Sequence, residues 1–206
     1  MIVAISRELG AGGLSVGEAI AAEIGASLLD ERTLIAELAA RGGFSAEYLS
    51  RLDEAPPSLS STFVQDIARA TALVRAMDVR STEQAVHDEI RGIVLERAKT
   101  GNVVLIGHGG ASLLVPHLGR DEIFSLLLHA SRSWRIGQVM ERFEIGLTEA
   151  EQRVRQTDEL RRRYVQHFFS TDIYDAHNYD LVLDTERTGM PAAIAIALAA
   201  LRATAR

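Results

Sequence analysis

Short apolar runs alternate with longer amphipathic segments along this 206-residue chain, and this alternation constrains the fold more than any other feature. The runs have the length and the continuous apolar character of parallel strands that are buried on both faces. The segments between them place apolar residues three or four positions apart, as helices that pack on a sheet do. The runs predict strands at residues 2–5, 27–29, 103–106, 123–128 and 180–183.

The intervening segments predict helices at residues 14–24, 31–40, 63–77, 82–98, 131–142, 148–169 and 190–202, with a short helix opening at 45–48 and a loop at 53–61. Strands that alternate with helices form a parallel sheet with helices on both faces, so we expect an α/β fold. Binding sites in such sheets lie at the carboxyl ends of the strands. Polar residues and glycines follow the predicted strands at residues 7–13, Asp30, 107–110, 131–135 and 184–185.

A glycine-rich turn, Gly10-Ala11-Gly12-Gly13, separates the first predicted strand from the first predicted helix. A dinucleotide-binding turn would use Gly10, Gly12 and Ser15, with Asp30 as the ribose-binding acid. Such a turn begins directly at the strand end, whereas residues 6–9 separate this strand from Gly10, which favours a longer phosphate-wrapping P-loop. A glycine turn without a ligand is the third interpretation.

The loop departs from the usual P-loop pattern G-x-x-x-x-G-K-[ST], because Arg7, Gly13 and Leu14 replace its first glycine, its lysine and its hydroxyl residue. Backbone amides at a helix N-terminus nevertheless bind anions without any side chain. The residues expected to bind phosphate are Gly10, Ala11, Gly12, Gly13, Leu14 and Ser15. All but one of the 22 basic residues are arginines, and the exception is Lys99, so we expect arginine to supply the missing positive charge.

Composition excludes several other functions. The net charge of −6 argues against a nucleic-acid partner, and the lack of cysteine excludes a thiolate nucleophile or a cysteine-bound metal. The longest apolar stretch, residues 192–201, has about half of the ~20 residues that span a bilayer. The N-terminus has no basic segment of a signal peptide, so we expect a cytoplasmic protein without a membrane partner.

The run Ile5-Ser6-Arg7-Glu8-Leu9-Gly10-Ala11-Gly12-Gly13 resembles the opening of the cytidylate kinase-like family, a branch of the nucleoside monophosphate (NMP) kinases. Further motifs follow in the same order at residues 29–31, at 104–109, in Asp158-x-x-Arg161-x-x-Tyr164 and at 179–185. The resemblance implies a P-loop NTPase fold with a five-stranded parallel sheet, a mobile helical NMP-binding insert at about 30–77 and an arginine-rich helical lid at about 142–170. Residues 1–29, 101–141 and 175–206 would form the core of this single domain.

The resemblance also implies an activity, the transfer of a phosphoryl group from ATP to CMP or dCMP with Mg²⁺. We expect cations to neutralise the transferred group, and the candidates are Arg7, Arg135 and Arg161. The acceptor would contact Asp30, His108, Asp158 and Arg161. Asp30 is equally compatible with a helix cap, and Ser15 with either a water-mediated contact to Mg²⁺ or a place on the helix surface.

Two positions lack the arginine usual in this family, because Leu14 follows the loop glycines and His108 follows the third strand. With Gly13 in place of the lysine, these departures keep a second hypothesis open, a nucleotide-binding regulatory module without kinase activity. A third is a kinase of another small metabolite, and a dehydrogenase is the fourth. The expected binding partners are small-molecule nucleotides.

Overall fold

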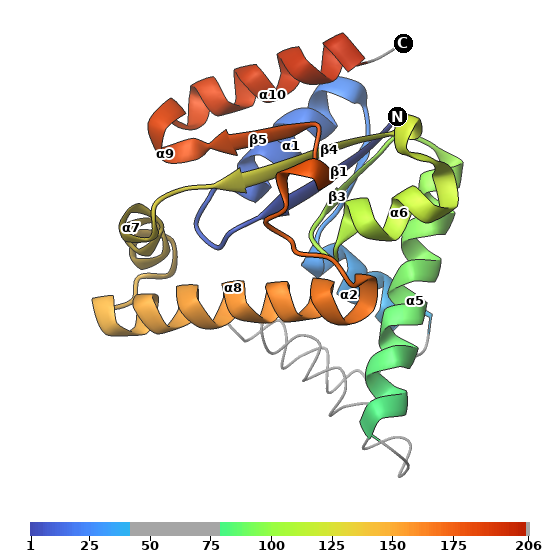
Figure 1. The fold of residues 1–206 in the computed structure, drawn as a ribbon, viewed down its shortest axis with the longest axis horizontal. Helices are drawn as coiled ribbons and strands as arrows, with labels where there is room; N and C mark the ends of the chain where they lie inside the picture. The colour runs from blue at the N-terminus through green and yellow to red at the C-terminus, as the bar shows by residue number, and fades with distance from the viewer. Residues whose placement is uncertain (42–78, 205–206) are drawn as a thin grey trace.

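The computed structural model describes residues 1–41 and 79–204. Five parallel strands form one sheet in the order β2-β3-β1-β4-β5 (Figure 1). Their bounds are β1 Ile2–Arg7, β2 Ser27–Leu29, β3 Val103–Ile106, β4 Ile123–His129 and β5 Leu181–Asp184. The α/β class and all five predicted strands are therefore confirmed.

The helices of the described residues are α1 Gly13–Ile24, α2 Glu31–Ala40, α5 Val79–Thr100, α6 Gly110–Leu118, α7 Arg132–Phe143, α8 Leu147–Phe169, α9 Thr185–Thr188 and α10 Met190–Thr204. Two short 3-10 helices, Arg120–Glu122 and Ala176–Asn178, precede β4 and β5. The predicted helices that can be compared agree with these bounds to within three residues. The elements predicted at 45–48, 53–61 and 63–77 lie outside the described residues, as does most of the predicted insert. No helix among the described ranges has the length and apolar character needed to cross a membrane.

Two helical layers cover the sheet because alternate residues of each strand point to opposite faces. Val3 and Ile5 of β1 face α1 and α10, whereas Ile2 and Ala4 face the layer that contains α5 and α6. Figure 1 shows α10 along one side of the sheet and α8 crossing the molecule on the other. The core is thus the three-layer arrangement that the apolar runs predict.

The end of β1 differs from the prediction. Pairing with β4 continues through Ser6 and Arg7, so β1 ends at Arg7 and only Glu8 and Leu9 precede Gly10. Loop length is therefore not what distinguishes the two phosphate-binding motifs. The strand order does, because a dinucleotide-binding fold places β2 beside β1, whereas here β3 lies between them. This topology removes the structural basis for the dehydrogenase hypothesis.

The segment predicted to form a lid is packed against the glycine loop. Leu9 joins an apolar cluster with Val139 of α7 and with Ala150 and Val154 of α8, and all four side chains are buried. The hairpin of α7 and α8 therefore forms a wall at the carboxyl end of β1 and β4, where the site was expected.

Candidate active site

The glycine loop ends in an open helix N-terminus. Gly10 and Gly12 have φ angles of 87° and 78°, in the left-handed region that favours glycine. Gly12 is the N-cap of α1 and makes no side-chain cap hydrogen bond, and the first turn contains no acidic residue. The first amides of a helix have no partner within it. This turn can therefore receive an anion through its backbone.

Arg7 runs across this loop toward the end of β3. A Cβ atom placed on Gly13 would lie 2.7 Å from Arg7 Cγ, and one placed on Gly107 would overlap the Arg7 guanidinium. The stem of Arg7 thus fills the space into which a side chain at position 13 would extend. Since a P-loop lysine would stand at position 13, Arg7 puts a positive charge beside the same loop from a different backbone position.

A second guanidinium lies beside the first. Arg161 of α8 donates from Nη1 to the Arg7 carbonyl at 3.2 Å. Burial, and next the charge of Arg161, lowers the pKa of Arg7 to about 9, so that Arg7 stays protonated at neutral pH. Burial also lowers the pKa of Arg161. Two cations held together in a partly buried site create a positive potential that favours an anionic ligand.

His108 faces the same two cations without adding charge. It has a left-handed φ of 53° and stands between two glycines that are also left-handed, Gly107 and Gly109. Burial, followed by the charges of Arg7 and Arg161, lowers the pKa of His108 to about 3. The imidazole is therefore neutral near pH 7, and it can donate one hydrogen bond and accept another.

Asp30 and Glu31 bring negative charge to the end of β2. Asp30 caps α2, since its Oδ1 accepts from the Thr33 amide at 2.9 Å, while the Thr33 hydroxyl accepts from the Asp30 amide at 2.8 Å. The capping alternative for Asp30 is confirmed by this geometry, which engages one of its two carboxylate oxygens. Burial raises the pKa of Glu31, and the charges of Arg7 and Arg161 oppose that shift.

Arg135 and Asp158 are bonded to each other and to the loop. Arg135 Nη1 donates to Asp158 Oδ2 at 2.5 Å and to the Leu9 carbonyl at 3.1 Å. Asp158 Oδ1 accepts from the Leu9 amide at 2.9 Å, and Arg135 Nε lies 3.2 Å from a carboxylate oxygen of Glu8. The structure brings the two predicted site residues to the glycine loop, with their polar atoms directed at protein groups.

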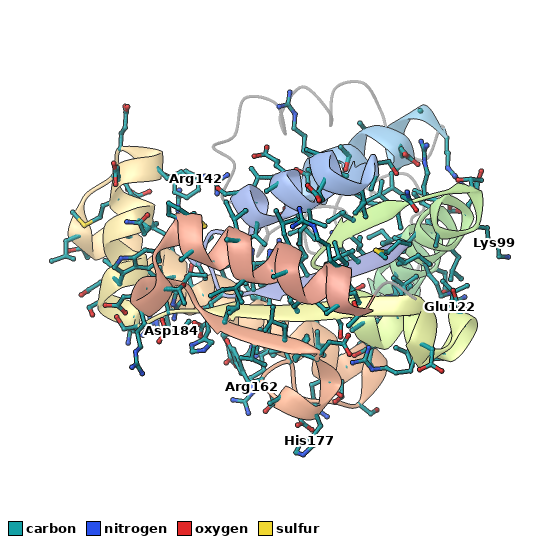
Figure 2. All side chains as sticks on the ribbon, turned by 90° about the horizontal axis from the view of Figure 1, so that it is seen from above. Lys99, Glu122, Arg142, Arg162, His177 and Asp184 are labelled. Atoms are coloured by element: carbon teal, nitrogen blue, oxygen red, sulfur yellow. The ribbon has the colours of Figure 1, made fainter. Side chains whose placement is uncertain are left out.

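Ser15 and Leu14, and two basic residues that were not site candidates, Arg162 and Lys99, have other surroundings. Ser15 is exposed, and Leu14, in the first turn of α1, packs against the core cluster that also contains residues of α10. Arg162 pairs with Asp172 at the molecular surface and points outward in Figure 2. Lys99 occupies the last turn of α5, just before β3 begins, so it lies near the amino ends of the strands and away from the glycine loop (Figure 2).

Sequence reasoning missed the roles of Glu8 and Glu31 at this site. Glu8 lies within the motif run at residues 5–13, and Glu31 follows Asp30 directly, so each had a motif residue as its neighbour. Neither position indicates by itself which cation its carboxylate meets. Among the described residues, no group of three or more His, Cys, Asp or Glu side chains could hold a metal ion.

Known proteins share this sequence pattern and fold. The sequence model of the cytidylate kinase-like family matches residues 2–187 of this chain. A cytidylate kinase from Pyrobaculum islandicum is 27% identical over 198 residues, which cover 96% of this chain and 91% of that protein. A cytidylate kinase from Methanothrix thermoacetophila is 25% identical over 203 residues, which cover 98% of this chain and 99% of that protein.

Solved structures share the fold over the whole chain. An uncharacterized protein from Eubacterium ventriosum superposes with a TM-score of 0.66 at 15% identity, covering 100% of this chain and 99% of its own. TT1252 from Thermus thermophilus superposes with a TM-score of 0.55 at 23% identity, covering 100% of this chain and 98% of its own. At these identities the likeness concerns the fold alone.

Proposed function

This chain belongs to the cytidylate kinase-like family, and from that premise we propose that it transfers the γ-phosphoryl group of ATP to CMP or dCMP. The observation that carries the proposal is the pair Arg7 and Arg161 beside the open N-terminus of α1. Phosphoryl transfer depends on positioning and on charge neutralisation more than on covalent chemistry. A loop that offers free amides, next to two guanidinium groups, supplies both.

The donor phosphates would lie against the amides that begin at Gly12, beside Arg7, whose stem lies at Gly13 and whose guanidinium lies at Gly107. Burial and then repulsion from Arg161 disfavour the protonated form of Arg7, and the carboxylates of Glu31, Asp30 and Asp158 offset only part of this effect on its pKa. A phosphate placed between the two cations would remove that repulsion. Two unit charges 4 Å apart interact by about 4 kcal/mol at an effective dielectric constant of 20, so this pairing is large enough to matter for binding.

The acceptor phosphate would approach from the ends of β2 and β3. Arg161 is the cation for its phosphate, and the second oxygen of Asp30 is directed to a sugar hydroxyl or a metal-bound water. His108 is neutral and would contribute one hydrogen bond in place of a charge. The acceptor site therefore relies on fewer positive charges than a site with arginine at position 108.

Mg²⁺ would neutralise the β- and γ-phosphate oxygens of ATP when bound. The residue at the usual hydroxyl position is Leu14, which has no oxygen ligand. Mg²⁺ keeps several waters and binds substrate phosphates with one or two carboxylates. The protein oxygens suited to this binding mode are those of Asp30, directly or through water, and the Ser15 hydroxyl through water.

A coupled assay of ADP formation from Mg-ATP, with each nucleoside monophosphate in turn, tests the proposal. We expect turnover that depends on the acceptor and is fastest with CMP or dCMP. No acceptor-dependent ADP with any of them would reject it. Turnover with a different small acceptor in a metabolite screen would favour another kinase activity on the same fold.

The second candidate is a nucleotide-binding module without catalysis, favoured by Leu14 and by the neutral state of His108. Calorimetry separates the two. ATP binding in the absence of any turnover supports the binding module, and robust turnover excludes it.

A further inference from the structure

The glycine loop is fixed along its first half and open along its second. Its Glu8 amide continues the β1–β4 pairing by donating to the Leu128 carbonyl at 3.0 Å. Leu9 is held on both sides, since its amide donates to Asp158 and its carbonyl accepts from Arg135. The amides of the first turn of α1 have no side-chain cap. Rigid attachment therefore ends where the open anion site begins.

One buried guanidinium joins the segments that meet here. The Arg135 side chain is 6% exposed, and its Nε donates to the Ala130 carbonyl at 3.1 Å while also facing Glu8. Its backbone is equally close, because a Cβ on Gly10 would lie 2.7 Å from the Arg135 carbonyl oxygen. Arg135 thus links the end of β4, the start of α7, the loop and Asp158 of α8.

Within this network one cation meets two carboxylates. The Arg135 cation lies between the carboxylates of Glu8 and Asp158, whose side chains are 15% and 14% exposed. Both Asp158 oxygens and two of the guanidinium nitrogens of Arg135 are bonded inside the protein. Removing one partner of a bonded, buried ion pair strongly destabilises the protein because the other charge is left buried and unpaired. This pair is therefore unsuited to opening in each catalytic cycle to contact a substrate.

We propose that Asp158 and Arg135 are positioning residues that hold Glu8, Leu9 and Gly10 rigid, so that the loop amides are arranged for phosphate before the nucleotide binds. Donors that are arranged in advance need no reorganisation at the moment of transfer, and this is where backbone anion sites gain most of their catalytic effect. The effect on rate rests on the proposed kinase function, whereas the effect on loop rigidity stands on the geometry alone.

Amide hydrogen exchange in the unliganded protein tests the rigidity directly. Asp158→Ala removes the acceptor of the Leu9 amide and one partner of Arg135, and we expect exchange in a peptide covering the loop to become at least ten times faster. Asp158→Asn keeps an oxygen for the Leu9 amide and should give a smaller increase. A peptide covering β3 is the internal reference, because a change there reports loss of the whole fold.

Glu159→Gln is the matched control. Glu159 is the next residue of α8, and its exposed carboxylate pairs with Arg163 at 2.7 Å on the same helix. This substitution also removes one negative charge from α8 without touching the loop. We expect loop exchange and turnover to match those of the wild type.

Steady-state kinetics provides the second measurement. Misplacement of reacting groups by about 1 Å can cost a factor of 10², so for Asp158→Asn we expect kcat to fall roughly 10- to 100-fold, with the KM of the acceptor changed less than about three-fold. Arg135→Lys keeps the charge but loses the planar fork, and we expect it to behave like the Asp158 variants. Direct contact between Asp158 and the acceptor predicts the opposite pattern, a raised acceptor KM with normal loop exchange.

Unchanged loop exchange in Asp158→Ala would overturn the proposal, and so would the pattern expected of an acceptor contact. If the wild type transfers no phosphoryl group at all, the proposed function fails, and the exchange measurement still decides whether Asp158 and Arg135 hold the loop.

Discussion

Replacing Arg7 by methionine should lower activity and raise stability at the same time. Methionine keeps an aliphatic stem beside Gly13 but removes the guanidinium. Loss of one preorganised donor to a developing charge typically costs a factor of 10²–10³ in kcat. We therefore expect kcat/KM for Mg-ATP to fall roughly 10²–10³-fold in the coupled assay.

The stability change has the opposite sign. Burial and Arg161 lower the pKa of Arg7 from 12.5 to about 9, which at 1.36 kcal/mol per pH unit corresponds to roughly 5 kcal/mol as an upper limit. Below pH 9 Arg7 is protonated in both the folded and the unfolded state, so the full penalty is present at pH 7. It disappears only as the pH rises from about 9 toward 12.5. Removing the charge removes the penalty.

The gain is reduced because Arg7 also stabilises the carboxylate of Glu31. We expect a net gain of at least ~1 kcal/mol, or about 2–4 °C in Tm for a chain of this size. Arg162→Met is the control, since the Arg162 side chain is 55% exposed and pairs with Asp172 at the surface. It should change neither activity nor Tm appreciably.

Two results would refute this reasoning about Arg7. Activity within three-fold of the wild type would mean that another group supplies the charge at the loop. A fall in Tm for Arg7→Met larger than that for Arg162→Met would mean that the cation stabilises the unliganded fold. Differential scanning calorimetry at pH 7 and the coupled assay measure the two quantities independently.

Substitutions at three further positions test other parts of the site. Asp30→Asn keeps a good helix cap and should reduce activity with little change in Tm. Asp30→Ala should reduce activity and also cost about 1 kcal/mol of stability. An equal loss of Tm in both variants would contradict the capping geometry. His108→Asn should gain more stability over the wild type at pH 5 than at pH 7. A histidine with a folded pKa of about 3 and an unfolded value of 6.5 costs the wild type about 2 kcal/mol at pH 5. The same pH dependence of Tm in variant and wild type would show that His108 is not buried as a neutral ring. Gly107→Ala places a methyl group on the Arg7 guanidinium at a φ of 92° and should lower kcat/KM at least ten-fold, and wild-type kinetics would contradict the position of Arg7.

The sequence predicts the positions of the five strands well because each contains a short apolar run that the local pattern reveals. It misplaces the end of β1, since Ser6 and Arg7 are polar but still pair with β4. It misses α6, a short helix that begins at Gly110 and contains Pro116, because both residues usually indicate loops. Helix formation there depends on burial of Leu113 in the core, which no local signal reports.

At the candidate site, too, local features could be predicted and long-range contacts could not. The sequence places Gly10 to Gly13 and Arg7 at the carboxyl end of β1, because fold and motif agree there. It cannot identify the partners of Arg135, since the Leu9 carbonyl lies 126 positions away and Asp158 lies 23 positions away. Periodicity and motif spacing describe near neighbours only. Arg135, which was predicted to neutralise the transferred group, is bonded in this structure to the Leu9 carbonyl of the loop and to Asp158.

Two departures of this loop from the usual P-loop, at positions 7 and 13, are consequences of one change. With Arg7 at the end of β1, its stem fills the space above position 13, so a lysine there would overlap it and glycine is required. The guanidinium then reaches the end of β3, where Gly107 must also lack a side chain. Glycine at position 13 is therefore a consequence of the positive charge coming from Arg7. Its lack of a side chain does not indicate that the loop has lost its positive charge. The same geometry requires that relatives with lysine at the position of Gly13 carry a small residue at the position of Arg7, and a relative with both long cations in place would show that the two sites are independent.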